Sequence, residues 1–194
     1  MDNLVKQSNK FRGKYKIEST RLKHWDYSSN GTYFITICTK NRERFLGEIV
    51  GGEMQLSEIG KIVQKYWLEI PDHFSFIVLD NFIIMPNHVH GIVVIDNANN
   101  VETRQCLVST SGMKTINRFQ NQGKHTISSI IGAYKSICTK TINKIQNKIF
   151  FGWQSSFYDH IIRSENELSR IREYIVNNPI KWDSDRNNPE NLYM

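Results

Sequence analysis

Two apolar segments that follow each other almost directly constrain the fold of this chain more than any other feature. The segment FSFIVLDNFIIM ends at Met85, and the segment HVHGIVVI runs from His88 to Ile95, with only Pro86 and Asn87 between them. Both segments are rich in β-branched and aromatic residues, which favours strands. Proline cannot donate to a strand ladder and favours a turn beside an asparagine, so the sequence predicts two strands separated by a turn.

Further strands and helices are predicted on both sides of this pair. Apolar residues recur every three to four positions in three segments, which predicts amphipathic helices over 57–70, 126–149 and 165–178. Ser57 is a good N-cap, and Ser164 with Glu167 forms a capping box. Pro71 and Pro179 are expected to end the first and the last helix. Strands are predicted for 31–39 and 156–163, and a hairpin around the glycine pair 51–52.

The order of these elements predicts an α+β fold. It contains a β-α-β-β-α-β core, which favours a ferredoxin-like arrangement with an antiparallel sheet and helices on one face. The last helix follows this core. We expect one domain over 31–182, a basic N-terminal arm over 1–30, a long surface loop over 96–125 and a tail of little pattern over 183–194.

The net charge of +6 is unevenly distributed along the 194 residues. Residues 1–24 hold seven Lys and Arg against Asp2 and Glu18, which gives this segment +5. A basic arm on a nearly neutral body is typical of proteins that bind nucleic acid, although a solvated tail has the same composition. No apolar run is long enough to cross a bilayer and no secretory signal is present, so we expect a cytoplasmic protein that does not bind membranes.

The paired histidines at the start of the second apolar strand form a candidate site. Residues two apart on a strand point the same way, so His88 and His90 share one face and Val89 faces the other. Two imidazoles placed like this can share a divalent cation when a further ligand arrives from elsewhere in the fold. The alternative is a pair of partly buried, hydrogen-bonded histidines.

The last predicted helix carries a second candidate group. Leu168, Ile171 and Ile175 form its apolar stripe, and Tyr174 and Asn178 lie four residues apart on an adjacent flank. A phenol and an amide would therefore face the same spot, although the tyrosine also fits packing at the rim of the core. Because proline disfavours helical angles in the residue before it, we expect the helix to be distorted at Asn178.

Several segments in the same order give a specific resemblance. The segments GTYFITICTKNRERFLG, MPNHVHG, SSIIGAYKSICTKTIN, WQSSFYDHIIR and YIVNNPIKW resemble those of the HUH single-tyrosine transposases. The chain is most similar to the branch of the REP-associated tyrosine transposases, from about Arg21 to Trp182. The loop over 96–125 is longer than expected for compact members, so no substrate contacts are transferred to it.

The resemblance implies an active site and a reaction. His88 and His90 would bind Mg²⁺ or Mn²⁺ with Asn178 as third ligand, and Tyr174 would be the nucleophile. Members of this family nick single-stranded DNA beside a hairpin, form a 5′-phosphotyrosine link and release a 3′-hydroxyl. A free phenol has a pKa near 10, so the metal or a basic neighbour such as Lys135 must favour the phenolate.

DNA contacts and competing functions remain open from the sequence. The candidate DNA-binding residues are Lys14, Lys16, Arg21, Lys23, Lys135, His160 and Arg163. One alternative function is a domesticated protein that binds or nicks hairpin DNA without mobility. Another is a metal-dependent hydrolase of small phosphate esters, which would explain neither the basic arm nor Tyr174. We expect a monomer, and a homodimer is the alternative.

Overall fold

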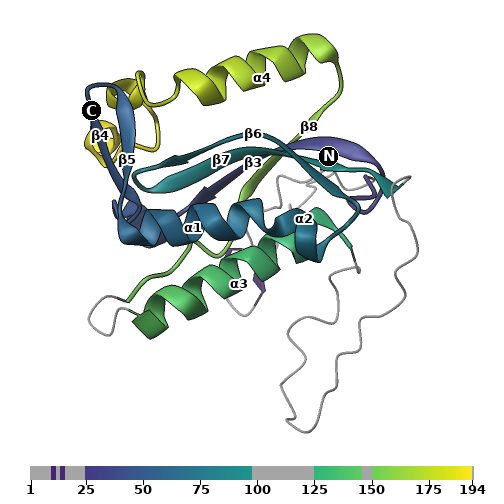
Figure 1. Ribbon diagram of the computed structural model, residues 1–194, viewed down its shortest axis with the longest axis horizontal. Coiled ribbons are helices and arrows are strands. Elements are labelled where there is room, and N and C mark those ends of the chain that lie inside the picture. Colours follow the sequence, from purple (N-terminus) through teal and green to yellow (C-terminus); the bar gives the residue numbers. More distant parts are fainter. Residues whose placement is uncertain (1–9, 12–13, 16–24, 98–124, 146–149, 194) are drawn as a thin grey trace, which may run out of the picture.

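The computed structural model describes residues 10–11, 14–15, 25–97, 125–145 and 150–193 (Figure 1). Of the predicted arm, it describes 25–30 and two short strands, β1 (Lys10–Phe11) and β2 (Lys14–Tyr15). Most of the predicted loop over 96–125 lies outside the described residues. In the part of the chain that is described, no helix is long and apolar enough to span a membrane.

Four strands form the central sheet. They are β3 (Gly31–Cys38), β6 (Ile77–Met85), β7 (His88–Ile95) and β8 (Tyr158–Ile162). Their order is β6-β7-β3-β8, and every neighbouring pair is antiparallel. The predicted strands and the turn at Pro86 are therefore confirmed, and Cys38 lies opposite His88 in the register.

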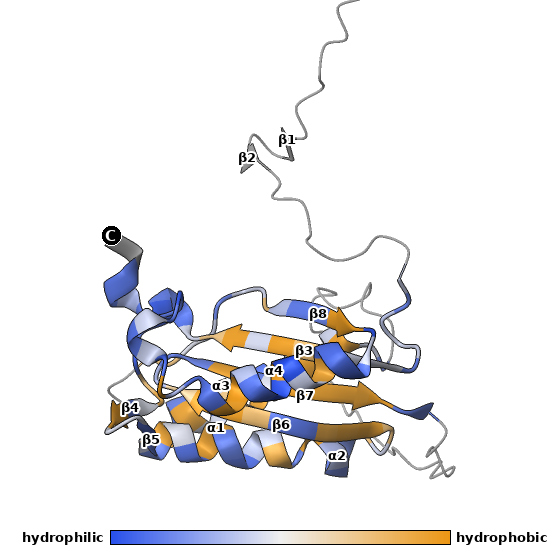
Figure 2. Ribbon diagram, turned by 90° about the horizontal axis from the view of Figure 1, so that it is seen from above, coloured by the Kyte–Doolittle hydropathy of each residue, from blue (hydrophilic) through white to orange (hydrophobic). Residues whose placement is uncertain are grey.

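The helices divide between the two faces of the sheet (Figure 1). The helices α1 (Glu58–Leu68), α2 (Ile70–His73) and α3 (Ile127–Ile145) cover one face, as the ferredoxin-like prediction requires. The helix α4 (Glu165–Asn177) crosses the other face, and Figure 2 shows it lying over the largely hydrophobic strands. Outside the sheet, β4 (Gly47–Val50) and β5 (Glu53–Leu56) form the predicted glycine hairpin. The predicted α+β class is confirmed.

Alternation along β7 sends side chains into two separate cores. Val89 and Val93 belong to the large core under α1 and α3, whereas Ile92 belongs to a small core with Ile175 of α4. His88 and His90 point to the same side as Ile92 because they are four and two residues before it. The side chain of Val89 lies on the opposite face, as predicted. This alternation places both imidazoles under α4.

The ends of the helices differ from the predictions in two places. Pro71 does not end α1, which stops at Leu68, but lies in the first turn of α2, where its missing N–H costs nothing. Asn178 keeps right-handed helical angles, φ −61° and ψ −40°, so the predicted distortion is wrong. The turn continues past Pro179, since the N–H of Lys181 donates to the carbonyl of Asn177.

The spacing of apolar residues in 126–149 predicts that Ile137 and Ile145 belong to the buried face of α3, and the structure differs at both positions. Ile142 is fully buried, whereas Ile137 is 40% and Ile145 is 63% exposed. An α-helix gains about 100° per residue, so a straight stripe drifts over five turns and the last contacts move to a neighbouring position.

The C-terminal tail has more structure than its sequence pattern suggested. It contains two short 3-10 helices, η3 (Trp182–Ser184) and η4 (Pro189–Tyr193). Asp185, Asn187 and Asn188 between them are buried polar residues.

Candidate active site

His88 is held by one neighbouring amide in a single tautomer. Its side chain is fully buried, and its Nδ1 lies 2.8 Å from Oδ1 of Asn87. The Asn87 amide cannot be reversed, because its Nδ2 donates to the carbonyls of Arg42 and Asn187 at 3.0 and 2.8 Å. Oδ1 therefore accepts, and Nδ1 of His88 carries the proton. The Nε2 atom is left with a free lone pair and has no hydrogen-bond partner among the described residues.

His90 links the sheet to the last helix. Its Nδ1 lies 2.9 Å from Oγ1 of Thr36 on β3, and its Nε2 lies 3.2 Å from the hydroxyl of Tyr174 on α4. The ring stacks on Phe34, with centroids 5.2 Å apart, and the ring of His88 is 4.4 Å away. The predicted pair of histidines and the predicted tyrosine are therefore in direct contact.

Both imidazoles are neutral. Burial lowers the pKa of His88 to about 3, and the charges of Arg42 and Arg186 act in the same direction. Burial, followed by the nearby His88, lowers the pKa of His90 well below its ordinary value. A metal ion binds the neutral form of imidazole, so neither residue needs to lose a proton to become a ligand.

Tyr174 faces the histidines and also reaches solvent. It is 38% exposed, and its ring packs edge-on against Phe34 and His90 with centroids 6.0 and 5.3 Å away. Partial burial raises the pKa of its phenol, and the negative charge of Asp185 raises it further, against smaller opposite effects of Asn178 and Arg186. The hydroxyl is therefore protonated at neutral pH and needs a nearby positive charge to ionise.

Asn178 and Asp185 lie together beside this group. Nδ2 of Asn178 donates to Oδ2 of Asp185 at 3.1 Å, while Oδ1 of Asn178 is buried with no partner in the described chain. Ligand atoms of His88, His90 and Asp185 all lie within 4.8 Å of one another, a group compatible with a metal ion. Asp185 is the residue that the sequence analysis missed. It lies in the tail, and the signal available in the sequence is an acidic residue seven positions after Asn178.

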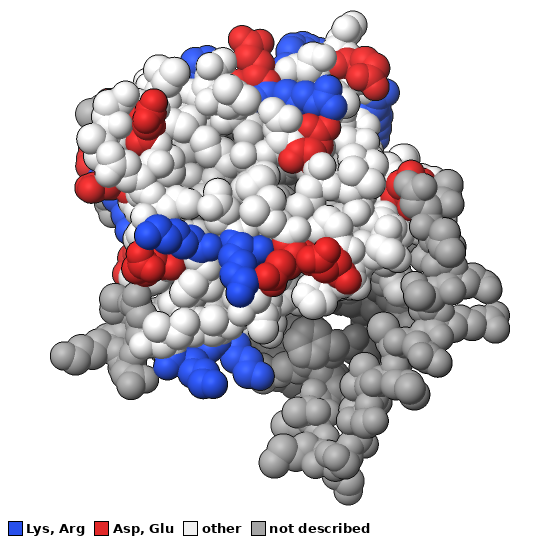
Figure 3. Space-filling model, viewed as in Figure 1, with Lys and Arg blue, Asp and Glu red and all other residues white. Residues whose placement is uncertain are grey.

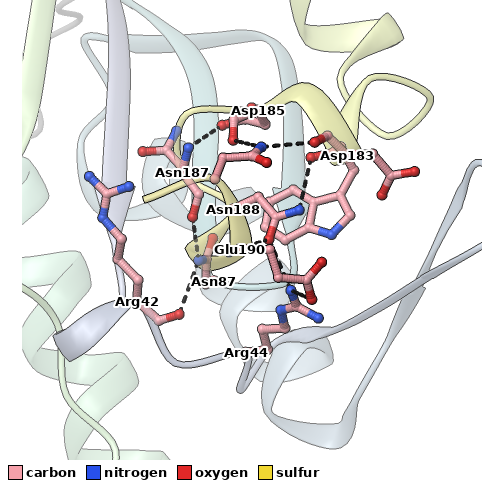
Figure 4. A network of polar contacts seen from close by, with 10 residues as sticks. Arg42, Arg44, Asn87, Asp183, Asp185, Asn187, Asn188 and Glu190 are labelled. Carbon is pink, nitrogen blue, oxygen red and sulfur yellow. Dashed lines mark hydrogen bonds and ion pairs between the residues drawn. The ribbon is translucent and has the colours of Figure 1, made fainter. Parts of the chain in front are cut away.

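A polar network fixes the tail against the turn that precedes β7 (Figure 4). Besides the bond between Asn87 and the carbonyl of Asn187, Arg44 donates to Oδ1 of Asn188 at 2.9 Å and pairs with Glu190 at 2.6 Å. Asn191 closes the tail on itself by donating to the carbonyls of Asp183 and Asp185. These contacts of the tail therefore fix the position of Asp185.

A cavity of about 500 Å³ opens beside the phenol of Tyr174. Its lining residues are Phe34, Tyr158, Tyr174, Asn178, Lys181, Ser184, Asp185 and Arg186. A second cavity of about 360 Å³ shares Tyr158 and Arg186 with it and also contacts Arg42. The guanidinium of Arg186 lies 5.7 Å from the ring centre of Tyr158, so both cavities have a positive and an aromatic wall.

The other predicted residues are more dispersed. Lys135 on α3 donates to the carbonyl of Gln154 at 2.6 Å, on the face of the sheet opposite α4, so it does not contact Tyr174. His160 pairs with Glu167 at 2.7 Å, and Arg163 is exposed. Lys14 lies in β2, and Lys16, Arg21 and Lys23 lie outside the described residues. In Figure 3, side chains of both signs are mixed over α1 and α4, so this face carries no single basic surface.

The donor set fits a divalent cation. It combines two neutral imidazoles, a carboxylate and an amide oxygen, and one imidazole nitrogen and the amide oxygen have no other partner among the described residues. Imidazole suits transition-metal ions, and carboxylate and carbonyl oxygens suit Mg²⁺ and Mn²⁺, so this mixed set is compatible with a divalent cation without fixing which one binds. Buried polar atoms are normally paired, so two unpaired acceptors, one on His88 and one on the amide that bonds to Asp185, are consistent with a partner that is not part of the chain.

The chain is 40% identical over 169 residues to an uncharacterised protein of Haemophilus influenzae. The match covers 87% of this chain and 91% of that protein. The chain belongs to the same family as this protein. No protein-family model matches the chain.

Two further matches are to proteins that are named as tyrosine transposases. A second H. influenzae protein, described as a candidate REP-associated tyrosine transposase, is 21% identical over 162 residues, which cover 80% of this chain and 74% of that protein. A solved structure of a REP-associated tyrosine transposase bound to a REP hairpin matches with a TM-score of 0.54 and 16% identity, over 85% of this chain and 74% of that chain. The solved structure shows that the fold is shared. The resemblance predicted from the sequence is confirmed.

Proposed function

We propose that this protein is a metal-dependent transesterase that nicks and rejoins single-stranded DNA beside hairpins. The observation that carries the proposal is the contact between the hydroxyl of Tyr174 and Nε2 of His90, 3.2 Å apart, in a group compatible with a metal ion. Two proteins named as REP-associated tyrosine transposases are similar to this chain, and one of them is described as bound to a REP hairpin. Both features support a role on hairpin DNA.

Tyr174 is the proposed nucleophile. Its oxygen attacks a DNA phosphorus, the new P–O bond forms a 5′-phosphotyrosine, and the bond to the 3′ oxygen breaks. The leaving oxygen takes up a proton and becomes a free 3′-hydroxyl. Because this exchange keeps one phosphodiester bond, a DNA 3′-hydroxyl can later reverse it without ATP. A phenol that is 38% exposed can reach a strand bound from solvent.

His88, His90 and Asn178 are the proposed ligands of Mg²⁺ or Mn²⁺. When bound, such an ion would withdraw charge from the phosphate and favour the phenolate form of the nucleophile. Hydrogen bonds hold two of these ligands in position before a metal ion binds. Asn87 fixes the tautomer of His88, and Thr36 orients His90 from the neighbouring strand. Hydrogen bonds of this kind are known to tune metal affinity.

The DNA strand is proposed to pass through the cavity beside Tyr174. Lys181 and Arg186 line this cavity and can neutralise phosphates, while Tyr158, which is 42% exposed, offers a face on which a base can stack. His160 lies in β8 and Arg163 directly follows this strand, and both line a further cavity beside Glu167. The predicted contacts of the basic arm remain part of this proposal.

A covalent trapping assay tests the proposed function. A labelled single-stranded oligonucleotide with a hairpin is incubated with the protein and Mn²⁺, and a protein–DNA band is sought on a denaturing gel. We expect an adduct that requires the metal and disappears in Tyr174→Phe. Tyr66→Phe is the matched control, since this phenol bonds to Thr141 in the helical layer on the other face of the sheet.

Three outcomes separate the competing functions. An adduct that persists in Tyr174→Phe would exclude this residue as the nucleophile. Hairpin binding with no adduct for any sequence tested would favour a domesticated binding protein. Release of phosphate from small esters, without a DNA adduct, would favour a hydrolase.

A further inference from the structure

We infer that Asp185 is a direct ligand of the divalent cation, so that the C-terminal segment completes the metal site. The inference rests on the proposed function, which assigns the metal to two histidines of β7 and one amide of α4. It adds a charged ligand from a third part of the chain and makes the tail part of the active centre.

The first observation is a buried carboxylate without a cation. Asp185 is 8% exposed, and no Lys or Arg of the described chain forms an ion pair with it. Ligand atoms of His88 and His90 lie within 4.8 Å of a carboxylate oxygen of Asp185 and of each other. An isolated ionised carboxylate is costly to bury, and such groups in proteins are paired or coordinate metals. A bound divalent ion supplies the missing charge.

The second observation is that the neighbouring lone pairs are also unused. Nε2 of His88 and Oδ1 of Asn178 are buried acceptors with no partner in the described residues. The Asn178 amide donates its Nδ2 to Asp185, which leaves Oδ1 as its only atom available for a cation. Unused lone pairs on β7 and beside α4 therefore accompany the carboxylate of Asp185 in the same small group of contacting residues.

Asp185 still has free coordination capacity. Oδ1 accepts from the backbone N–H of Asn187, and Oδ2 accepts from Nδ2 of Asn178. A carboxylate can accept about four hydrogen bonds, so each oxygen keeps a lone pair. The two existing bonds fix the plane of the carboxylate, as neighbouring groups commonly do for metal ligands.

A charged oxygen ligand also changes what the site prefers. Two imidazoles and an amide are neutral, and a carboxylate reduces the net charge of the occupied site from +2 to +1. Carboxylate oxygen favours Mg²⁺ and Mn²⁺, whereas softer ligands favour metals such as Zn²⁺. The identity of residue 185 is therefore expected to set the choice of metal.

Calorimetric titration of the full chain with Mn²⁺ tests the inference. We expect Asp185→Asn to lower the affinity at least about tenfold, by analogy with losses of 10- to 100-fold for groups that only orient a ligand. Asp183→Asn is the matched control, because it makes the same charge change two residues away at an exposed position and is expected to leave the affinity unchanged. Thermal unfolding without metal shows whether each variant is folded.

A change of ligand type gives a second readout that a purely structural role would not move. Asp185→Cys replaces the carboxylate with a thiolate, and we expect it to bind Cd²⁺ with an ultraviolet charge-transfer band and to favour Cd²⁺ over Mn²⁺ relative to the unchanged chain. Asp183→Cys is the control and is expected to show no such band.

The outcomes distinguish this inference from the proposed function. Equal Mn²⁺ affinity in Asp185→Asn and Asp183→Asn, or no thiolate band in a folded Asp185→Cys, would overturn the role of Asp185. Absence of Mn²⁺ binding by the unchanged chain would overturn both proposals. Weakened Mn²⁺ binding in Asp185→Asn, together with no DNA adduct in the unchanged protein, would support Asp185 as a metal ligand and reject the nicking reaction.

Discussion

The variant Asn87→Ala tests most directly whether hydrogen bonds hold the proposed metal ligand His88 in the correct tautomer before an ion binds. Its side chain makes three hydrogen bonds, two donated to the carbonyls of Arg42 and Asn187 and one accepted from Nδ1 of His88. In Asn87→Ala, nothing fixes the proton of His88 on Nδ1, so the tautomer that presents a free Nε2 loses its advantage. We expect Mn²⁺ affinity to fall about 10- to 100-fold.

The same substitution has a calculable effect on stability. Each lost hydrogen bond contributes about 1 kcal/mol net, so the free energy of unfolding should fall by about 3 kcal/mol. For a chain of this size, that corresponds to a melting temperature lower by about 6–12 °C. The carbonyl of Asn187 loses its partner at the same time, which loosens the tail beside Asp185.

A matched variant separates the two effects. The side chain of Asn143 makes two hydrogen bonds to the backbone of Phe151, at 3.1 and 2.9 Å, on the other side of the sheet. Asn143→Ala should therefore lose about 2 kcal/mol of stability without a change in Mn²⁺ affinity. Melting curves and calorimetric titration of both variants provide the measurement. Wild-type Mn²⁺ affinity in a folded Asn87→Ala would refute the proposed control of the tautomer.

Three further predictions concern metal binding, the core and the anchor of α4. Saturation with Mn²⁺ at about 100 times its Kd should stabilise the protein by about 2.7 kcal/mol; a melting temperature insensitive to both Mn²⁺ and a chelator would contradict the metal site. Gly91→Ala should destabilise by about 1–3 kcal/mol, because an added Cβ would lie 2.2 Å from Cζ2 of Trp67; denaturant unfolding measures this. The Arg172 guanidinium lowers the pKa of Asp80 from its ordinary value of 3.8, so Arg172→Gln should lower the stability slightly at neutral pH, as expected for an ion pair with an exposed partner. This difference should vanish as the pH falls below 3.8 and Asp80 is protonated in the folded state; a cost that persists in acid would show that the contact is not electrostatic.

Local sequence rules recovered most of the fold because they act over short distances. The two residues between Met85 and His88 allow only a tight turn, and the alternation in β7 decides which face receives the histidines. The cap at Ser57 is made by its own side chain, which accepts from the N–H of Gly60. Such features depend on neighbours in the sequence and can be predicted without knowledge of the tertiary structure.

Errors occurred where long-range contacts override a local preference. The residue before a proline usually avoids helical angles, but Asn178 keeps them in a turn that continues into the tail, where its amide bonds to Asp185. In α3, Ile142 is buried instead of Ile137 and Ile145, because packing against α1 and the sheet decides which side of a long helix is buried. Neither outcome is encoded in the immediate neighbours of these residues.

The candidate site was recognisable in part because two of its elements carry regular spacings. A period of two places His88 and His90 on one face of a strand, and a separation of four places Tyr174 and Asn178 on one flank of a helix. In the structure the two pairs meet, with the hydroxyl of Tyr174 3.2 Å from Nε2 of His90. Asp185 follows no period, since it lies between two short 3-10 helices and reaches the site only because Asn87 and Arg44 hold the tail in place. The proposed ligand in this segment could be found only in the structure, where Asp185 is 8% exposed and no Lys or Arg of the described residues forms an ion pair with it. A buried carboxylate without such a pair is a candidate to bind a cation.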